Sequence, residues 1–253
     1  MEQAPAVWSE SFRVRACEVD ATGKASVTAV ANWLQEAAGN HVTALGWAVD
    51  DLAPRGLTWV LSRLRLRLQH PPGWRDEVRV VTWHAGVLRL YGVREFRLTD
   101  AQDRELGTAI SAWLLIDLAT RRPTRPLAAL PGLDRHPATP SLAEPFDKIP
   151  ELSSPEREAT EVVRFSDLDM NRHANNVSVI SWLLEALPAD IVLGSSLIEL
   201  EIEFRAEALH GDRVHAQAQR VAAEGTAFLH RLVREGDGRE IARARTVWAS
   251  GRT

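Results

Sequence analysis

Two periodic patterns divide the chain: segments in which apolar and polar residues alternate, and segments with apolar residues at helical spacing. Helical spacing occurs once in each half, at 30–45 and 180–187, with Ser26 and either Asn175 or Asn176 placed to cap the helices. Alternation predicts four strands after each helix, at 57–68, 77–85, 88–99 and 105–118, and at 197–208, 213–222, 227–234 and 240–249. A short strand, one helix and an antiparallel sheet, present twice, predict the α+β class.

The second half of the chain repeats the first at one constant offset in numbering. A Trp-Leu dipeptide recurs, and because tryptophan is rare, this match is the most informative one. The offset relates Arg15 to Arg164, Asp20 to Asp169, Ala25 to Ala174, Trp33 to Trp182, Leu34 to Leu183, Glu36 to Glu185, and Ala37 to Ala186. The offset is smaller between Trp113 and Trp248 in the last strands, so we expect extra residues in the first half, around 49–56.

Both predicted helices are apolar around much of their circumference. A helix of this kind is stable when a curved sheet wraps it, which is the hotdog arrangement. The chain is therefore predicted to be an α+β protein built as a tandem hotdog, in which an antiparallel sheet wraps each central helix.

A proline-rich stretch separates the two halves. Eight of the 13 prolines lie between Pro123 and Pro155. Proline lacks a backbone N–H and restricts φ, so this stretch is unsuited to a helix or an inner strand. In a chain of 253 residues we expect an N-terminal hotdog domain at 6–125, a linker at 126–157 and a C-terminal, catalytic domain at 158–253.

Composition and charge narrow the functional classes. The net charge of -4 gives no indication of a nucleic-acid or membrane partner, and no apolar run approaches the roughly 20 residues that span a bilayer. The first ten residues lack the basic start and apolar core of a signal peptide, and Cys17 has no second cysteine to pair with. A cytoplasmic protein is the simplest prediction, with a leader already removed as the alternative.

The two halves differ just before their helices. The second has Asp169, Asn171 and His173, whereas the first has Thr22 and Lys24 in place of the last two. If the loop is extended, alternate side chains point the same way, toward a helix N-terminus that favours developing negative charge. An aspartate, an asparagine and a histidine in this place suit acyl transfer. A polar loop that only caps the helix is an alternative of equal weight.

The segment 165–177, together with 182–185, closely resembles the signature of the plant and bacterial acyl-ACP thioesterases. The first half resembles the family in five further segments: 23–26, 33–36, 40–42, 57–60 and 74–78. The resemblance runs from about Phe12 to Trp248. It implies a tandem hotdog and hydrolysis of the thioester between a fatty acyl chain and acyl carrier protein, which ends fatty acid synthesis.

The resemblance also implies the catalytic residues. Asp169, Asn171 and His173 match three of them, and the fourth, an acidic residue on a following strand, matches Glu207. Some members have a cysteine beside that acid. Here the position is Ala208, so a cysteine mechanism is not available there.

Periodicity alone gives Glu207 a different role. Strict alternation along 198–207 places it on a polar face with Glu199, Glu201 and Glu203, which we expect to be surface charges. Only the resemblance selects Glu207. With His173 it would position and deprotonate a water molecule, or a carboxylate would attack the thioester directly to form an anhydride.

Two groups of arginines suggest how an acidic carrier protein is steered. One comprises Arg63, Arg65 and Arg67, which alternate with leucines; the other comprises Arg121, Arg122 and Arg125. An ordinary solvated strand face is the alternative, and we favour it slightly for any single arginine.

Other activities remain open from the sequence. The nearest is an acyl-CoA thioesterase of the same fold, followed by a hotdog hydratase or dehydratase and a non-catalytic acyl-binding module. The sequence has no Gly-x-Ser-x-Gly elbow and no Cys/His cluster, so neither an α/β-hydrolase nor a zinc site is expected, and no cofactor is predicted. A homodimer is a further expectation, and the first domain is expected to bind the acyl chain.

Overall fold

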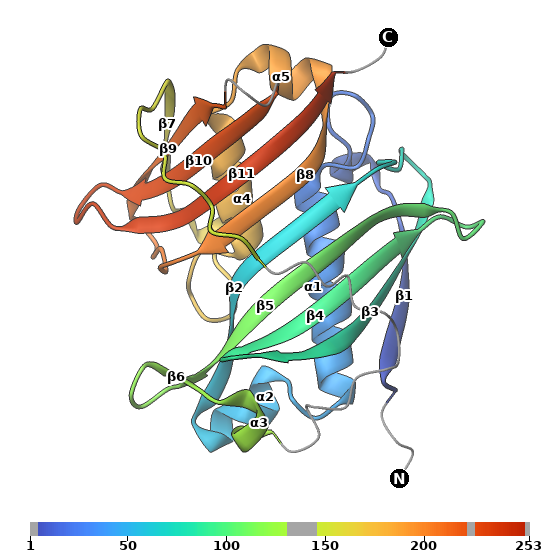
Figure 1. Cartoon of the computed structure of the whole chain (residues 1–253), viewed down its shortest axis with the longest axis vertical. Helices are drawn as coiled ribbons and strands as arrows, with labels where there is room; N and C mark the ends of the chain where they lie inside the picture. Colours follow the sequence, from blue (N-terminus) through green and yellow to red (C-terminus); the bar gives the residue numbers. More distant parts are fainter. Residues whose placement is uncertain (1–4, 131–145, 222–225, 251–253) are drawn as a thin grey trace.

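A computed structural model describes residues 5–130, 146–221 and 226–250 (Figure 1). Residues 131–145 of the predicted linker, and residues 222–225 between two predicted strands, lie outside the described residues. Each copy is a central helix behind a curved antiparallel sheet, and the two sheets join edge to edge (Figure 1). The result is an 11-stranded sheet in the order β1-β3-β4-β5-β2-β8-β11-β10-β9-β7, with β6 paired to β5.

The first copy contains six strands and three α-helices among the described residues. The strands are β1 (Val7–Arg13), β2 (Leu57–Leu68), β3 (Glu77–Leu88), β4 (Tyr91–Thr99), β5 (Glu105–Asp117) and β6 (Arg122–Thr124). The helices are α1 (Val27–Ala44), α2 (Val49–Leu52) and α3 (Pro126–Ala129), with the 3-10 turns η1 (Ala16–Glu18) and η2 (Ala53–Arg55).

The second copy follows the same order. Its strands are β7 (Arg157–Val162), β8 (Ser195–Phe204), β9 (Arg213–Arg220), β10 (Ala227–Arg234) and β11 (Glu240–Ser250). Its helices are α4 (Asn176–Glu185) and α5 (Ala189–Gly194), with the 3-10 turn η3 (Phe165–Asp167). All eight predicted strands are present, but β8 ends at Phe204, whereas alternation predicted a strand through residue 208.

The two central helices begin alike and end differently. The Ser26 side chain accepts the N–H of Ala29 at 3.2 Å, and the Asn175 side chain accepts the N–H of Val177 at 2.9 Å. Helix α1 has 18 residues, whereas α4 has 10. The prediction that the extra residues of the first copy lie around 49–56 is therefore wrong in the main, because most of them lengthen α1.

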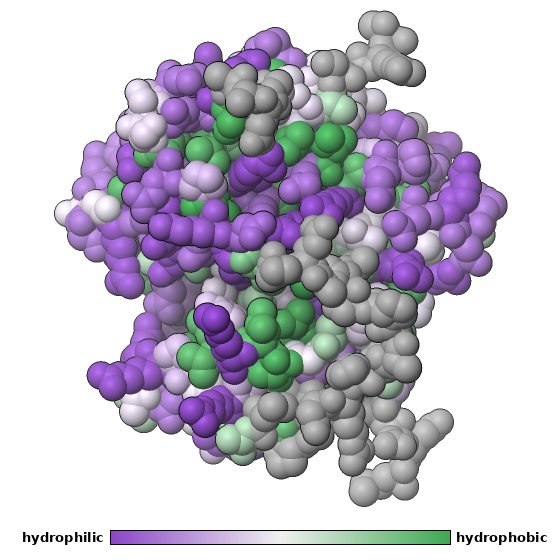
Figure 2. All heavy atoms as spheres, viewed as in Figure 1, coloured by the Kyte–Doolittle hydropathy of each residue, from purple (hydrophilic) through white to green (hydrophobic). Residues whose placement is uncertain are grey.

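The hydrophobic core is continuous across both copies. It includes Leu66 on β2, Ile202 on β8, Trp33 on α1 and Leu183 on α4, all 3% exposed or less. Full burial of a leucine or isoleucine contributes on the order of 2 kcal/mol, so the shared core favours the two copies staying together. Hydrophilic side chains predominate on the outer face, with hydrophobic ones visible in smaller areas between them (Figure 2).

Charged residues line the junction between the copies. Strand β2 pairs antiparallel with β8, which sets each of three arginines opposite a glutamate: Arg63 and Glu203, Arg65 and Glu201, and Arg67 and Glu199. The three ion pairs measure 3.7, 3.0 and 3.1 Å in that order.

This pairing corrects two predictions. The three arginines of β2 do not form the predicted basic face, because each pairs with a glutamate of the other copy. Glu201 is not a surface charge either, since it is 7% exposed and its partner Arg65 is 6% exposed. The Arg65 guanidinium also lies over the Phe146 ring, with its Cζ atom 5.8 Å from the ring centroid.

None of the helices among the described residues is long and apolar enough to cross a membrane.

Candidate active site

The polar motif of the second copy forms a tight turn before α4. The N–H of Asp169 donates to the carbonyl oxygen of His173 at 2.8 Å, and the N–H of Arg172 donates to the carbonyl oxygen of Asp169 at 3.0 Å. Arg172 has a φ of 63°, in the left-handed region. The extended conformation considered from the sequence does not occur, because these hydrogen bonds close the chain on itself.

Within this turn, the Asp169 carboxylate accepts hydrogen bonds from backbone N–H groups. Its Oδ1 accepts the N–H of Asn171 at 2.8 Å and the N–H of His173 at 3.3 Å. Its Oδ2 lies 3.4 Å from Nδ2 of Asn171. The carboxylate thus holds the turn that presents the other two side chains.

Glu207 lies beyond the end of β8. The N–H groups of Arg205 and Ala206 both donate to the carbonyl oxygen of Ile241, at 2.8 and 3.2 Å, so the chain leaves the regular ladder there. Alternation no longer determines which way the next side chain points. Glu207 turns toward the motif, and its Oε2 lies 3.5 Å from Nε2 of His173.

Two backbone contacts hold the Glu207 loop against the turn. The N–H of Ala174 donates to the carbonyl oxygen of Ala208 at 2.8 Å, and His173 forms an isolated β-bridge with Leu209. The His173 side chain is 31% exposed and that of Glu207 is 47% exposed. Both groups are therefore within reach of water and of a substrate entering from solvent.

Arg121 of the first copy also reaches this site. Its Nη2 lies 3.1 Å from Oε2 of Glu207 and 3.4 Å from Oε1. The sequence analysis placed Arg121 in a carrier-protein cluster and did not identify it as a site residue. No signal within either half could have done so, because the contact joins the two copies.

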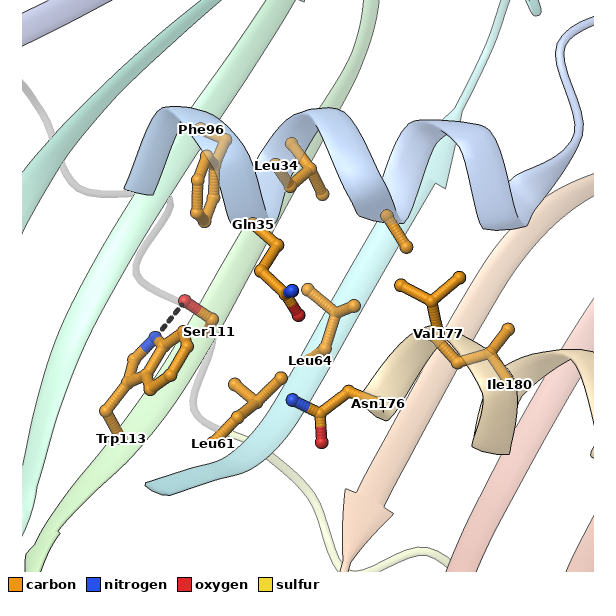
Figure 3. A pocket seen from close by; sticks show the side chains of 11 residues that line it. Leu34, Gln35, Leu61, Leu64, Phe96, Ser111, Trp113, Asn176, Val177 and Ile180 are labelled. Atoms are coloured by element: carbon orange, nitrogen blue, oxygen red, sulfur yellow. Dashed lines mark hydrogen bonds between the residues drawn. The ribbon is translucent and has the colours of Figure 1, made fainter. Parts of the chain in front are cut away.

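A narrow apolar cavity of about 20 Å³ lies beside the first turn of α4 (Figure 3). Most of its lining comes from the first copy: Ala31, Leu34, Gln35, Leu61, Leu64, Phe96, Ser111 and Trp113. The second copy contributes Asn176, Val177 and Ile180. Asn176 is the first residue of α4, three residues after His173, so the cavity lies where the first turn of α4 meets the first copy.

The buried histidines His41 and His230 lie away from the site. His41 on α1 accepts from Nη1 of Arg94 through Nδ1 and donates from Nε2 to the carbonyl oxygen of Pro5, both at 2.9 Å. His230 on β10 donates from Nδ1 to the carbonyl oxygen of Leu183 at 3.2 Å. Burial lowers the pKa of each to about 4, so both are neutral near pH 7.

Family models match both halves of the chain. The acyl-ACP thioesterase N-terminal domain matches residues 5–128, and the acyl-ACP thioesterase C-terminal domain matches residues 153–250. The chain belongs to the acyl-ACP thioesterase family. It is 31% identical over 283 residues to the chloroplastic oleoyl-acyl carrier protein thioesterase of Coriandrum sativum, over 95% of this chain and 76% of that protein.

Solved structures of this family share the fold. An acyl-ACP thioesterase from Bacteroides thetaiotaomicron superposes with a TM-score of 0.87 at 26% identity, over 98% of this chain and 100% of that one. The 12:0-ACP thioesterase from Umbellularia californica gives the same TM-score at 23% identity, over 98% of each chain, and shows the fold alone. The predicted α+β tandem hotdog is confirmed.

Proposed function

We propose that this chain hydrolyses fatty acyl-[acyl-carrier-protein] to a free fatty acid and carrier protein, and so ends fatty acid synthesis. The main support is the approach of Nε2 of His173 to within 3.5 Å of Oε2 of Glu207, together with an apolar cavity at the first turn of α4, the helix that follows His173. An acid–base pair next to an apolar binding space suits hydrolysis of an acyl thioester. The names of the relatives support the same substrate class.

In the proposed reaction, water attacks the thioester carbonyl carbon. Glu207 and His173 take the proton from the water, and Asn171 hydrogen-bonds the carbonyl oxygen or the water. The carbon–sulfur bond then breaks, and the thiol leaves with a proton returned by the pair. Asp169 orients the loop, and its two bonds to backbone N–H groups make it a poorer nucleophile than Glu207.

The proposal assigns a different role to each of the two copies. The N-terminal domain, 6–125, would bind the acyl chain, while the C-terminal domain, 158–253, would hold the catalytic residues. Support comes from the cavity, whose lining is drawn mainly from α1, β2, β4 and β5. The acyl carbonyl would then lie near His173 and the tail would extend into the first copy.

A direct assay tests the function. Purified protein is given matched acyl-ACP and acyl-CoA substrates, and the products are separated by mass. Free fatty acid released faster from acyl-ACP supports the proposal. Preference for acyl-CoA favours the nearest alternative, an enoyl product indicates a dehydratase, and binding without turnover indicates an acyl-binding module.

The cytoplasmic location and the homodimer remain predictions from the sequence. Cell fractionation tests the first, and light scattering of the purified protein tests the second.

A further inference from the structure

Arg121 belongs to the first copy, yet its side chain lies at the candidate site of the second. Its Nη2 contacts Oε2 of Glu207 at 3.1 Å, and the same oxygen faces Nε2 of His173 at 3.5 Å. We propose that Arg121 is a positioning residue that holds the Glu207 carboxylate toward His173, so that the site is complete only with both copies. This inference rests on the proposed thioesterase function.

The turn that bears Arg121 is held by Asp117, the last residue of β5. The Asp117 carboxylate accepts the N–H of Thr120 at 2.8 Å and its hydroxyl at 2.9 Å, and the Asp117 carbonyl accepts the N–H of Arg121 at 2.8 Å. Arg121 itself has a φ of 57°, in the left-handed region that glycine adopts without strain. An arginine in a conformation that suits glycine is consistent with a task for its side chain.

An ordinary surface ion pair is the first alternative, because the Arg121 side chain is 68% exposed. An exposed ion pair whose two side chains have no other partners usually contributes little to protein stability. Glu207 is held at both ends, however: Nη1 of Arg234 donates to its carbonyl oxygen at 3.3 Å, while Arg121 and His173 face its carboxylate. A side chain restrained in this way has a defined direction, which a surface pair does not require.

Docking of the carrier protein is the second alternative. The phosphate of a carrier-bound thioester lies at the far end of the pantetheine arm from the thioester. A group in contact with Glu207 stands at the thioester end, so its loss should act on the chemical step. Loss of positioning lowers kcat for every thioester, whereas loss of docking raises KM for the carrier-bound substrate alone.

The test compares Arg121→Gly and Arg121→Lys with the control Arg97→Gln. Each is assayed on acyl-ACP and on acyl-N-acetylcysteamine, which has neither phosphate nor carrier. Glycine suits the left-handed backbone, so the variant should keep its turn, and thermal melting checks this. We expect kcat of Arg121→Gly to fall by about tenfold to a hundredfold on both substrates with KM nearly unchanged.

Two partial recoveries should accompany that loss. Arg121→Lys retains the charge but not the planar group, and should recover part of kcat. Millimolar guanidinium ion should recover part of kcat in Arg121→Gly, because it can occupy the vacated space beside Glu207. Arg97→Gln should stay within about twofold of the unaltered protein, because Arg97 forms a different, exposed ion pair, with Glu105 at 3.5 Å.

Three results would overturn the inference. A kcat for Arg121→Gly within about twofold of the unaltered protein would reduce the contact to a surface ion pair. A higher KM for acyl-ACP alone would assign Arg121 to docking. Either result leaves the thioesterase proposal intact, whereas failure of the unaltered protein to hydrolyse any thioester removes both.

Discussion

The two copies fold the same turn before their central helices and place different side chains on it. In the first copy, Oδ1 of Asp20 accepts the N–H of Lys24 at 3.3 Å, and in the second, Oδ1 of Asp169 accepts the N–H of His173 at 3.3 Å. The residue of the turn with left-handed backbone is Gly23 in the first copy, with a φ of 75°, and Arg172 in the second, with a φ of 63°. The aspartate therefore holds the backbone in both copies, and its presence alone does not mark a catalytic turn.

The loop opposite the turn shows the same relation. In the first copy, the N–H of Ala25 donates a hydrogen bond to the carbonyl oxygen of Pro72. In the second, the N–H of Ala174 donates to the carbonyl oxygen of Ala208, and both bonds measure 2.8 Å. The preceding residues are Pro71 and Glu207. The first copy thus has a proline in place of Glu207 and a lysine in place of His173, so it lacks both proposed proton-transfer groups but keeps the hydrogen bonds that hold the loops.

The interiors differ as well. At matching positions of the central helices, the first copy has Ala31 where the second has Ile180, and Ala31 lines the cavity. Ile180 lines the same cavity, so the smaller Ala31 leaves more room on the side of the first copy, which favours acyl-chain binding there.

The largest expected effect concerns the imidazole that the first copy lacks. His173→Ala should lower kcat by at least about a thousandfold, because the proton-transfer pair is lost, while the fold and carrier-protein binding remain. Steady-state kinetics and a pull-down of carrier protein measure the two properties. Lys24→Ala is the matched control and should change kcat little. Activity of His173→Ala within about tenfold of the unaltered protein would exclude His173 from the mechanism.

Glu207 and Glu203 separate catalysis from the charge pairing between copies. Glu207→Gln should lower kcat by at least about a hundredfold, as expected for loss of a general base. Glu203→Gln should have a small effect on kinetics, because Glu203 faces Arg63 at 3.7 Å in the junction. Equal, small effects at both positions would direct attention to Asp169 as the group that activates the nucleophile.

Each copy buries one histidine whose pKa is lowered to about 4, His41 in the first and His230 in the second. Unfolding returns both toward their ordinary pKa of 6.5, so the unfolded chain binds more protons between these values. The free energy of unfolding should therefore fall as pH drops from about 6.5 to 4, by on the order of a few kcal/mol for each histidine.

Urea unfolding at a series of pH values measures this loss. His230→Gln and His41→Gln, each compared with the unaltered protein, should show a shallower dependence on pH even if their stability at neutral pH is lower. An unfolding free energy that is equal at the two ends of this range would contradict the assignment of neutral, buried imidazoles.

Room inside the first copy should set the product length. Ala31→Ile replaces a methyl group by a branched side chain in a cavity of about 20 Å³, so the products should shift toward shorter fatty acids. Profiling the free fatty acids released in bacteria measures the shift. Exchange of residues 30–46 with those of a relative should also change length, whereas exchange of 178–187 should mainly lower the rate. The reverse pattern would place the acyl tail in the second copy.

The smallest effect is expected at the single cysteine. Cys17 is exposed, and Ser166 occupies its position in the second copy. Cys17→Ser should leave kcat within about twofold of the unaltered protein, because this thiol lies outside the motif turn. A loss of several hundredfold in a folded variant would reopen thiol catalysis.

The sequence alone was sufficient for the elements and the family. Strand β2 spans Leu57–Leu68 as alternation predicted, and Ser26 and Asn175 cap the two central helices. These features depend on neighbouring residues, whose spacing the sequence displays directly. The longer α1 agrees with the helical spacing predicted over 30–45, but the place of the insertion was missed, because an offset between repeats does not say where an insertion lies.

Only the tertiary structure decided where the charges meet. Arg65 and Glu201 form a buried pair because β2 lies beside β8, and no local pattern specifies which strand edges will adjoin. Glu207 faces His173 because the chain leaves the ladder after Phe204, which ends the alternation that would have turned it away. Side-chain direction beyond a strand end, and contacts between distant segments, are set by packing and hydrogen bonds that exist only in the folded chain.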